Sequence, residues 1–164
     1  TLSFRLGESE LRTLPVEHLK GDYAACSYFP SVARPENTAF VHKFQKRFGD
    51  HRLVTDSMES AYVAVHLWAR AAAKAGDAQP AAVRPALPGL QTNGPGGPVR
   101  IDPGNRYSWK VARVAQIGER GTFKIVWSSE EPVEPKPFPS TRTREQWLRF
   151  LAGLQHNWEG RWGR

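Results

Sequence analysis

Cysteine is nearly absent from this chain, and so is any long apolar run. The 164 residues contain one cysteine, Cys26, which excludes an internal disulfide and a cysteine metal cluster. Cys26 stands in the apolar run 23–29, where a thiol serves as a small core side chain. No apolar run approaches the roughly 20 residues of a membrane-spanning helix. We therefore expect no direct membrane insertion by the sequence given.

Catalytic and metal-binding patterns are also missing. The glycine-rich run 93–97 is followed by a strand pattern, whereas a phosphate cradle needs the N-terminus of a helix. No nucleophile elbow or serine–histidine arrangement is present. The five histidines lack metal-ligand spacing: His18, His42, His51, His66 and His156. The sequence therefore predicts a protein that is not an enzyme, and it indicates no metal or cofactor.

The charge of the chain is positive but dispersed. Lysine and arginine outnumber the acidic residues by 23 to 16, a formal net charge of +7 that favours anionic surroundings. The basic residues are spread along the chain and form no block. A nucleic-acid-binding module would carry basic and aromatic residues interleaved on one face, and only the C-terminal tail approaches this. We expect no nucleic-acid partner.

The order of periodic segments predicts a mixed α/β fold. Strand patterns cover residues 2–5, 23–29, 98–102, 110–117 and 122–127, and helix patterns cover 8–19 (interrupted at Pro15), 36–48, 57–75 and 144–158. A further helix is predicted to open at Pro80. For the long helix, Asp56 or Ser57 is the expected N-cap and Gly76 the stop. Its expected core face is Met58, Ala61, Tyr62, Val65, Trp68, Ala69 and Ala72.

The last two strand patterns predict a β-hairpin. Residues 110–117 and 122–127 are joined by the four-residue, glycine-bounded segment 118–121. In the second strand, alternation places Phe123, Ile125 and Trp127 on one face.

Several segments carry recognisable motifs in a fixed order. Residues 94–102 read G-P-G-G-P-V-R-I-D and residues 123–129 read F-K-I-V-W-S-S, followed by a proline-rich exit. Upstream stand S-F (3–4), E-S-E-L (8–11), Y-A-A (23–25), S-Y-F-P-S (27–31), P-E-N (35–37) and T-D-S-M-E (55–59). In these motifs the chain resembles periplasmic-type (type 1) solute-binding proteins for urea and short-chain amides. It departs from their pattern at Cys26, at Pro85 and in its long Trp-rich tail.

The resemblance implies a partial two-lobe fold, because this chain resembles only the C-terminal half of such proteins. By that analogy residues 1–22 end lobe 2, and residues 23–100 form the C-terminal part of lobe 1. Residues 101–131 form a hairpin returning to lobe 2. Residues 132–164 are a proline-rich linker and a C-terminal amphipathic helix. We therefore expect a fragment.

The resemblance also implies a function. The leading expectation is the solute-binding component of an ABC-type uptake system, periplasmic, with a small neutral amide or urea as ligand and a membrane permease as partner. The alternative is a cytoplasmic amide sensor that controls a transcription antitermination regulator. A secretory signal upstream of residue 1 would separate the two.

Three residues are candidate ligand contacts. Glu8 follows the first strand, where α/β proteins place ligand-facing groups, and its carboxylate could accept hydrogen bonds from an amide NH2. It could equally be a helix N-terminal glutamate stabilised by the dipole. Tyr28 ends the next strand, as either a donor to a ligand carbonyl or a core tyrosine. Asp56 is either a ligand contact or a helix cap.

The tail carries an amphipathic helix with two possible roles. Trp147, Phe150, Leu151, Leu154 and Trp158 fall on one face. A basic, tryptophan-rich helix of this kind can lie on an anionic membrane or dock on a protein. We expect it to dock on the body of its own chain.

Overall fold

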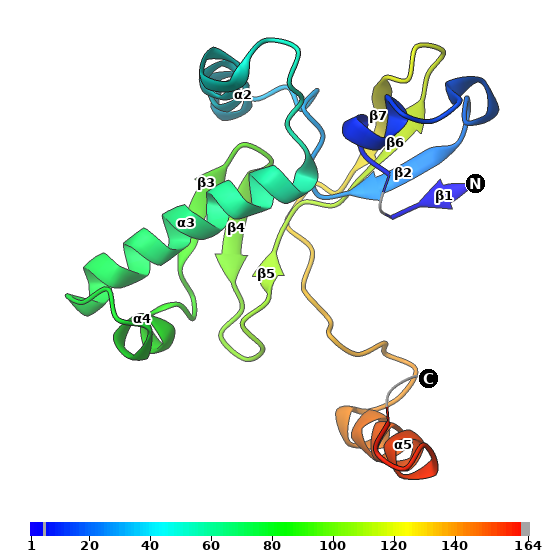
Figure 1. Ribbon diagram of the computed structural model, residues 1–164. Helices are drawn as coiled ribbons and strands as arrows, with labels where there is room; N and C mark the ends of the chain where they lie inside the picture. The colour runs from blue at the N-terminus through cyan, green and yellow to red at the C-terminus, as the bar shows by residue number, and fades with distance from the viewer. Residues whose placement is uncertain (5, 162–164) are drawn as a thin grey trace. The chain divides into compact units, whose positions relative to one another are not determined.

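The computed structural model describes residues 1–4 and 6–161 of the chain (Figure 1). These residues divide into two compact units, Thr1–Glu134 and Pro135–Arg164. Each unit is considered by itself below. The first is mixed α/β, as the sequence predicts.

One sheet of the first unit has four strands. They are β1 (Leu2–Ser3), β2 (Tyr23–Cys26), β6 (Arg113–Ile117) and β7 (Phe123–Ser128), in the order β1-β2-β6-β7. β1 and β2 are parallel, and the other pairs are antiparallel. Helix α1 (Glu8–Leu11) and the 3-10 turn η1 (Val16–His18) connect β1 to β2, with Pro15 capping η1. The core here is Leu11, Ala24, Phe29, Ala115, Ile117 and Phe123.

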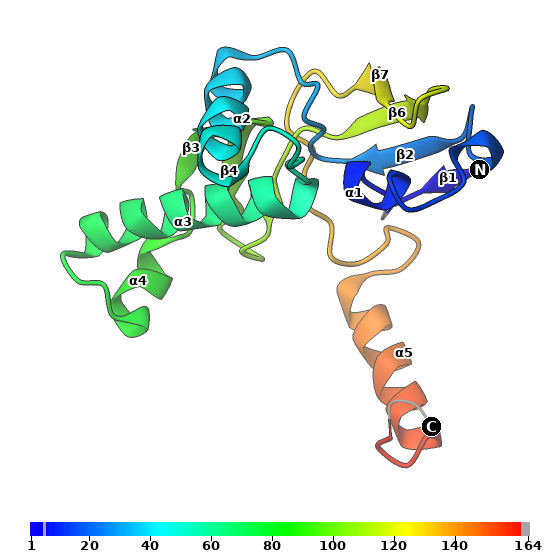
Figure 2. The ribbon, with the colours of Figure 1, turned by 45° about the horizontal axis from the view of Figure 1, so that its top comes forward.

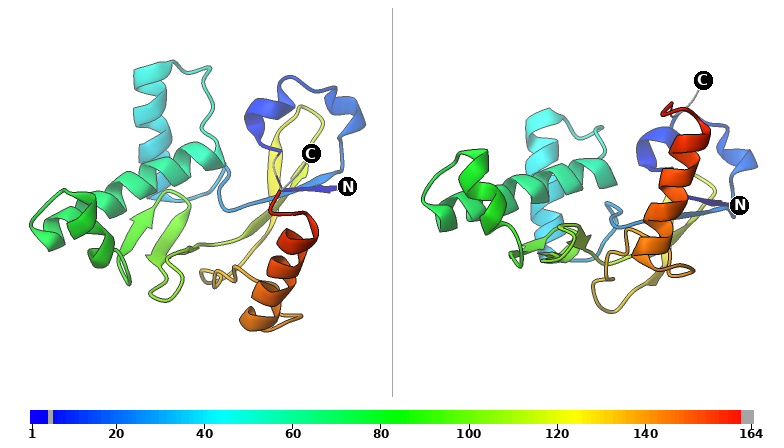
Figure 3. Two further views of the ribbon diagram at one scale, coloured as in Figure 1. Left: turned by 60° about the horizontal axis from the view of Figure 1, so that its bottom comes forward. Right: turned by 90° about the horizontal axis from the view of Figure 1, so that it is seen from below.

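A second sheet has three antiparallel strands, β3 (Gln91–Gly94), β4 (Gly97–Ile101) and β5 (Ser108–Trp109). Helix α3 (Asp56–Ala75) lies alongside it, as two further views show (Figure 3). Val63 and Leu67 of α3 pack on Val99 and Ile101 of β4. Helices α2 (Pro35–Phe48) and α4 (Pro80–Ala86) flank α3 in the sequence.

The predicted core face of α3 is wrong. Met58, Tyr62, Val65 and Trp68 are all exposed, Trp68 to 46%. The helix carries a second stripe four residues apart, and that stripe is buried: Glu59, Val63, Leu67 and Ala71. The exposed face carries the larger apolar side chains, so the sequence pattern favoured that face over the buried one.

The N-cap of α3 also differs from the prediction, because the hydroxyl of Thr55, rather than Asp56 or Ser57, accepts the Met58 N–H at 3.4 Å. Gly76 ends the helix at φ +70°, as predicted.

The β6–β7 hairpin contains a bulge that changes which face Trp127 occupies. Ala115 pairs with Ile125, but the preceding Val114 pairs with Trp127, so Val126 is an extra residue on its strand. An extra residue reverses the alternation beyond it. Trp127 is therefore 53% exposed, and its predicted place beside Phe123 and Ile125 is wrong.

The second unit contains helix α5 (Arg144–Asn157), close to the predicted 144–158. A capping box fixes its start: the Thr143 hydroxyl accepts the Gln146 N–H, and the Gln146 side chain accepts the Thr143 N–H. Trp147 Nε1 donates to the Pro139 carbonyl at 2.8 Å. Docking of this helix on the body stays a prediction. In the part of the chain that the structure describes, no helix has the length and apolarity to cross a membrane.

Candidate functional site

A cleft in the first unit separates the segment around α1 from the N-terminal end of α3. Figure 2 shows these two elements facing one another. The cleft encloses about 780 Å³. Its lining comes from Phe4, Leu6, Gly7, Ser9, Glu10, Arg12 and Thr13 on one side, from His51, Arg52, Leu53, Thr55, Asp56, Ser57 and Met58 on the other, and from Cys26 at the end of β2.

Asp56 is the one of the three predicted residues that lines this cleft. It is the first residue of α3, where the helix dipole favours a negative charge. Its Oδ1 accepts a hydrogen bond from Ser27 Oγ at 2.6 Å. Because Thr55 provides the cap, Asp56 is available for another role.

Glu8 begins α1 and is half-buried, and its neighbours Gly7 and Ser9 line the cleft. The pKa of its carboxyl is raised from 4.5 to about 7, mainly by burial; the negative charges of Glu10 and Asp56 contribute to the rise, and a backbone hydrogen bond opposes it. The structure thus brings Glu8 into the electrostatic range of Asp56. Near neutral pH, Glu8 exists in both its protonated and its ionised form.

Tyr28 is 1% exposed and belongs to a core cluster with Phe40 of α2 and with Val54, which precedes α3. Its hydroxyl donates to Oδ1 of Asn37 at 2.7 Å. The Asn37 amide in turn donates to the carbonyls of Pro30 and Val32, both at 2.8 Å. A ligand carbonyl would have to compete with Asn37 for the Tyr28 hydroxyl proton. Contact between Tyr28 and a ligand stays a prediction.

Cys26 lines the cleft as a neutral thiol. Burial raises its pKa to about 11, and the charges of Asp56, Glu8 and Glu10 add to the effect. Such a thiol is a poor nucleophile. Among the described residues, no cluster of three or more histidine, cysteine or acidic side chains could hold a metal ion.

Three buried polar residues were missed by the sequence analysis: Asn37, Glu59 and Arg113. Asn37 and Glu59 lie in the P-E-N and T-D-S-M-E motifs, which marked the segments but not the roles of these side chains. No sequence signal distinguished Arg113 from the other basic residues.

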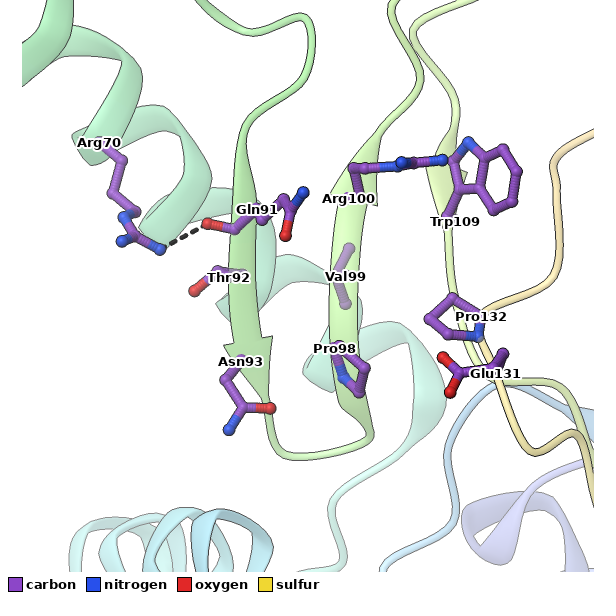
Figure 4. A pocket seen from close by; sticks show the side chains of 10 residues that line it. All are labelled: Arg70, Gln91, Thr92, Asn93, Pro98, Val99, Arg100, Trp109, Glu131 and Pro132. Carbon is purple, nitrogen blue, oxygen red and sulfur yellow. Dashed lines mark hydrogen bonds between the residues drawn. The ribbon is translucent and has the colours of Figure 1, made fainter.

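A second hollow of about 590 Å³ lies on the three-stranded sheet (Figure 4). The Arg100 guanidinium stacks over the Trp109 ring, 4.2 Å from its centroid. Trp109 Nε1 donates to Oδ2 of Asp102 at 2.9 Å, and Arg70 donates to the Gln91 carbonyl. None of Glu8, Tyr28 and Asp56 lines this hollow.

Comparison with known families identifies the chain. A family model described as a periplasmic binding protein domain matches residues 1–144. The chain belongs to this family.

Solved structures of solute-binding proteins share the fold at low identity. A solute binding protein of an ABC transporter from Rhodopseudomonas palustris HaA2, in complex with p-hydroxybenzoic acid, has a TM-score of 0.68 and 24% identity over 80% of this chain and 37% of its own. An amino acid ABC transporter substrate-binding protein from Pseudomonas fluorescens Pf-5 has a TM-score of 0.67 and 20% identity over 79% and 36%. A leucine binding protein from Thermotoga maritima has a TM-score of 0.57 and 19% identity over 68% and 31%. The chain therefore spans about a third of the length of these proteins.

A sequence relative carries the name of an enzyme. Limonene hydroxylase from Geobacillus stearothermophilus is 30% identical over 121 residues, which are 74% of this chain and 22% of that protein. The family model describes a binding protein domain, and the solved structures carry the names of binding proteins.

Proposed function

We propose that this chain is part of the solute-binding component of an ABC-type uptake system, and that its solute is urea or a short-chain amide. The family and the names of the solved structures support the first statement. The cleft chemistry supports the second. The protein would act in the periplasm and deliver its solute to a membrane permease.

The gathering of carboxyl groups at the cleft carries the proposal for the solute. Glu10 and Asp56 line the cleft, and burial together with the charges of these two carboxylates raises the pKa of Glu8. Carboxylates accept hydrogen bonds from N–H groups and repel anions. Urea and amides present N–H donors and carry no charge, whereas a benzoate would bring a further negative charge.

Arg12 and Arg52 also line the cleft, but both are exposed, so solvent screens their charges more than that of the half-buried Asp56. Arg12 Nη1 donates to the His51 carbonyl at 2.7 Å, which joins the two sides of the cleft. Asp56 is half-buried, and the hydrogen bond from Ser27 to its Oδ1 orients its carboxylate, which would accept the solute N–H groups.

The assignment to two lobes is part of the same proposal. We assign residues 1–22 and the hairpin within 101–131 to lobe 2, residues 23–100 to lobe 1, and residues 132–164 to the linker and helix. The strands form two separate sheets, which supports two lobes, but the sheets do not follow the segment boundaries: β2, within residues 23–100, joins β1, and β5, within residues 101–131, joins β4. Under this assignment β2 contributes to the sheet of lobe 2, and the ligand would lie where the lobes close.

Isothermal titration calorimetry tests the proposal, with the polypeptide that carries this chain at its natural length. Urea and acetamide have four heavy atoms each, so a ceiling of about 1.5 kcal/mol per atom limits affinity to tens of micromolar. We expect binding of urea or acetamide and none of benzoate or leucine. The variant Asp56→Asn should weaken binding about tenfold or more, since it replaces a charged acceptor.

Glu17→Gln is the matched control, because Glu17 is an exposed carboxylate of η1 outside the cleft lining. It should bind like the unmodified protein. Binding of benzoate or leucine with no response to either amide would overturn the solute class. Unchanged affinity in Asp56→Asn would overturn the site.

A further inference from the structure

Gly96 is held from both sides by two buried charged residues. Glu59 Oε1 accepts the Gly96 N–H at 3.2 Å, and Arg113 Nη2 donates to the Gly96 carbonyl at 2.6 Å. Glu59 is 0% exposed and Arg113 is 7% exposed. We refer to Glu59, Gly96 and Arg113 as the Gly96 clamp.

The clamp joins elements that are distant in the sequence. Glu59 lies on α3, Gly96 in the turn between β3 and β4, and Arg113 at the start of β6. Lys110, just before β6, donates from Nζ to Glu59 Oε2 at 2.7 Å and to Ser60 Oγ at 3.0 Å. The clamp therefore connects the three-stranded sheet and α3 to the four-stranded sheet.

Close packing disfavours a side chain at Gly94 and Gly96 in this turn. A Cβ on Gly96 would lie 3.1 Å from Glu59 Oε1, and one on Gly94 would lie 2.8 Å from Cγ2 of Val63. Because the Gly96 backbone lies so close to Glu59 and α3, the Glu59 carboxylate and the Arg113 guanidinium bond its N–H and its carbonyl directly.

Burial of this kind is costly unless the charges compensate one another. Burial lowers the pKa of Arg113, while the negative charge of Glu59 acts in the opposite direction. Two buried charges with satisfied hydrogen bonds add little net stability over an apolar core, but they fix one geometry. A role in positioning accounts for their presence here.

The clamp leads to the cleft through Ser27. Arg113 Nη1 donates to the Ser27 carbonyl at 2.5 Å, and Ser27 Oγ donates to Asp56 Oδ1 at 2.6 Å. A single residue thus receives a hydrogen bond from Arg113 through its backbone and gives one to Asp56 through its side chain.

We propose that Arg113 is a positioning residue for the ligand cleft: by holding Ser27 and Gly96 together it fixes the Asp56 carboxylate relative to the junction of the two sheets. The inference rests on the proposed function, in which Asp56 contacts the solute. Arg113 is not among the residues that line the cleft.

A double-mutant cycle in the natural-length polypeptide tests this coupling. Arg113→Lys keeps the charge but offers one ammonium in place of the planar fork that reaches two carbonyls. We expect it to weaken urea or acetamide binding about tenfold, and Ser27→Ala to weaken it similarly. If Arg113 acts through Ser27, the double variant should lose little more than either single variant. Fully multiplied losses would overturn the proposal.

Arg70→Lys is the control, since Arg70 also donates to a backbone carbonyl, that of Gln91, but far from Ser27 in the hydrogen-bond network. It should leave affinity unchanged. Equal losses in Arg70→Lys and Arg113→Lys would show a general effect of arginine removal and would overturn the proposal.

Hydrogen exchange without ligand separates this inference from the proposed function. Arg113→Lys and Ser27→Ala should both accelerate amide exchange across residues 56–59, at the start of α3, whereas Arg70→Lys should not. If the protein binds no amide, the proposed solute fails, and exchange still decides on the positioning role. Unchanged exchange in both variants would overturn that role. Ser27→Ala removes only the hydroxyl of a half-buried residue, so it keeps the test decisive if Arg113→Lys fails to fold.

Discussion

Tyr28 and Asn37 form a buried hydrogen-bonded pair in which the phenol donates to the amide oxygen at 2.7 Å. Asn37 also bonds the carbonyls of Pro30 and Val32. The pair thereby fixes the turn that follows β2 to the first part of α2. Each polar atom named here has a partner, which is the condition for burying it without a large cost.

Tyr28→Phe should lower the free energy of unfolding by about 1–3 kcal/mol, because it leaves the buried Asn37 oxygen without a donor. Denaturant unfolding of the natural-length polypeptide measures the change. Tyr107→Phe is the control: Tyr107 is exposed, and its loss of a hydroxyl should have no measurable effect. If Tyr28 instead serves mainly the ligand, Tyr28→Phe would weaken binding while leaving stability unchanged.

Glu8 should make stability depend on pH between about 5 and 8. Its folded pKa of about 7 lies above the ordinary value of 4.5, so the folded state retains a proton that the unfolded state releases. The stabilisation that this retained proton gives the folded state is complete below the unfolded pKa and is lost as pH rises through the folded pKa. Unfolding free energy should therefore fall across this range, and Glu8→Gln should flatten the fall. Chemical denaturation at several pH values measures it.

The same ionisation should affect binding in the opposite direction. An ionised Glu8 accepts amide N–H groups better than a protonated one, so urea affinity should rise as pH increases through about 7. Glu17→Gln, at an exposed carboxylate, should preserve both profiles. A pH-independent affinity in the unmodified protein would contradict a role for Glu8 in binding.

Much of the fold was predictable where one local signal dominates. Gly76 ended α3 and the spacing around residue 144 placed α5, because glycine at positive φ and a capping box act within a few residues. Strand β3 was missed because Gln91, Thr92 and Asn93 show no apolar alternation; its place comes from pairing with β4. The face of α3 was misjudged because two apolar stripes compete, and only packing on Val99 and Ile101 selects one.

The candidate site was less predictable than the fold. Asp56, predicted as a ligand contact or a helix cap, lines the cleft, and its proximity to the segment after β1 follows from the fold rather than from sequence spacing. Arg113 could not be recognised, since its importance depends on bonds to Ser27 and Gly96, 86 and 17 residues away.

The bulge in β7 predicts a contrast between two aromatic residues. Phe123→Ala should cost about 3–5 kcal/mol of unfolding free energy, because Phe123 is buried and packs on Phe29. Trp127→Ala should cost less than about 1 kcal/mol, since half of that side chain is exposed in this chain. Denaturant unfolding of both variants measures the difference. Equal large losses would contradict the exposed position of Trp127.

Two glycines should respond to alanine in opposite directions. In Gly96→Ala the new Cβ would lie 3.1 Å from the buried Glu59 carboxylate. Either the turn or Glu59 must move, so we expect a loss of about 1–3 kcal/mol in stability together with weaker urea binding.

Gly153 lies within α5, has no atom within 4 Å of a new Cβ and does not have a positive φ. Gly153→Ala should therefore stabilise that helix by about 1 kcal/mol and leave binding unchanged. Thermal unfolding and calorimetry on the two variants test this contrast. Unaltered binding in a destabilised Gly96→Ala would separate the clamp from the cleft and count against the positioning role of Arg113.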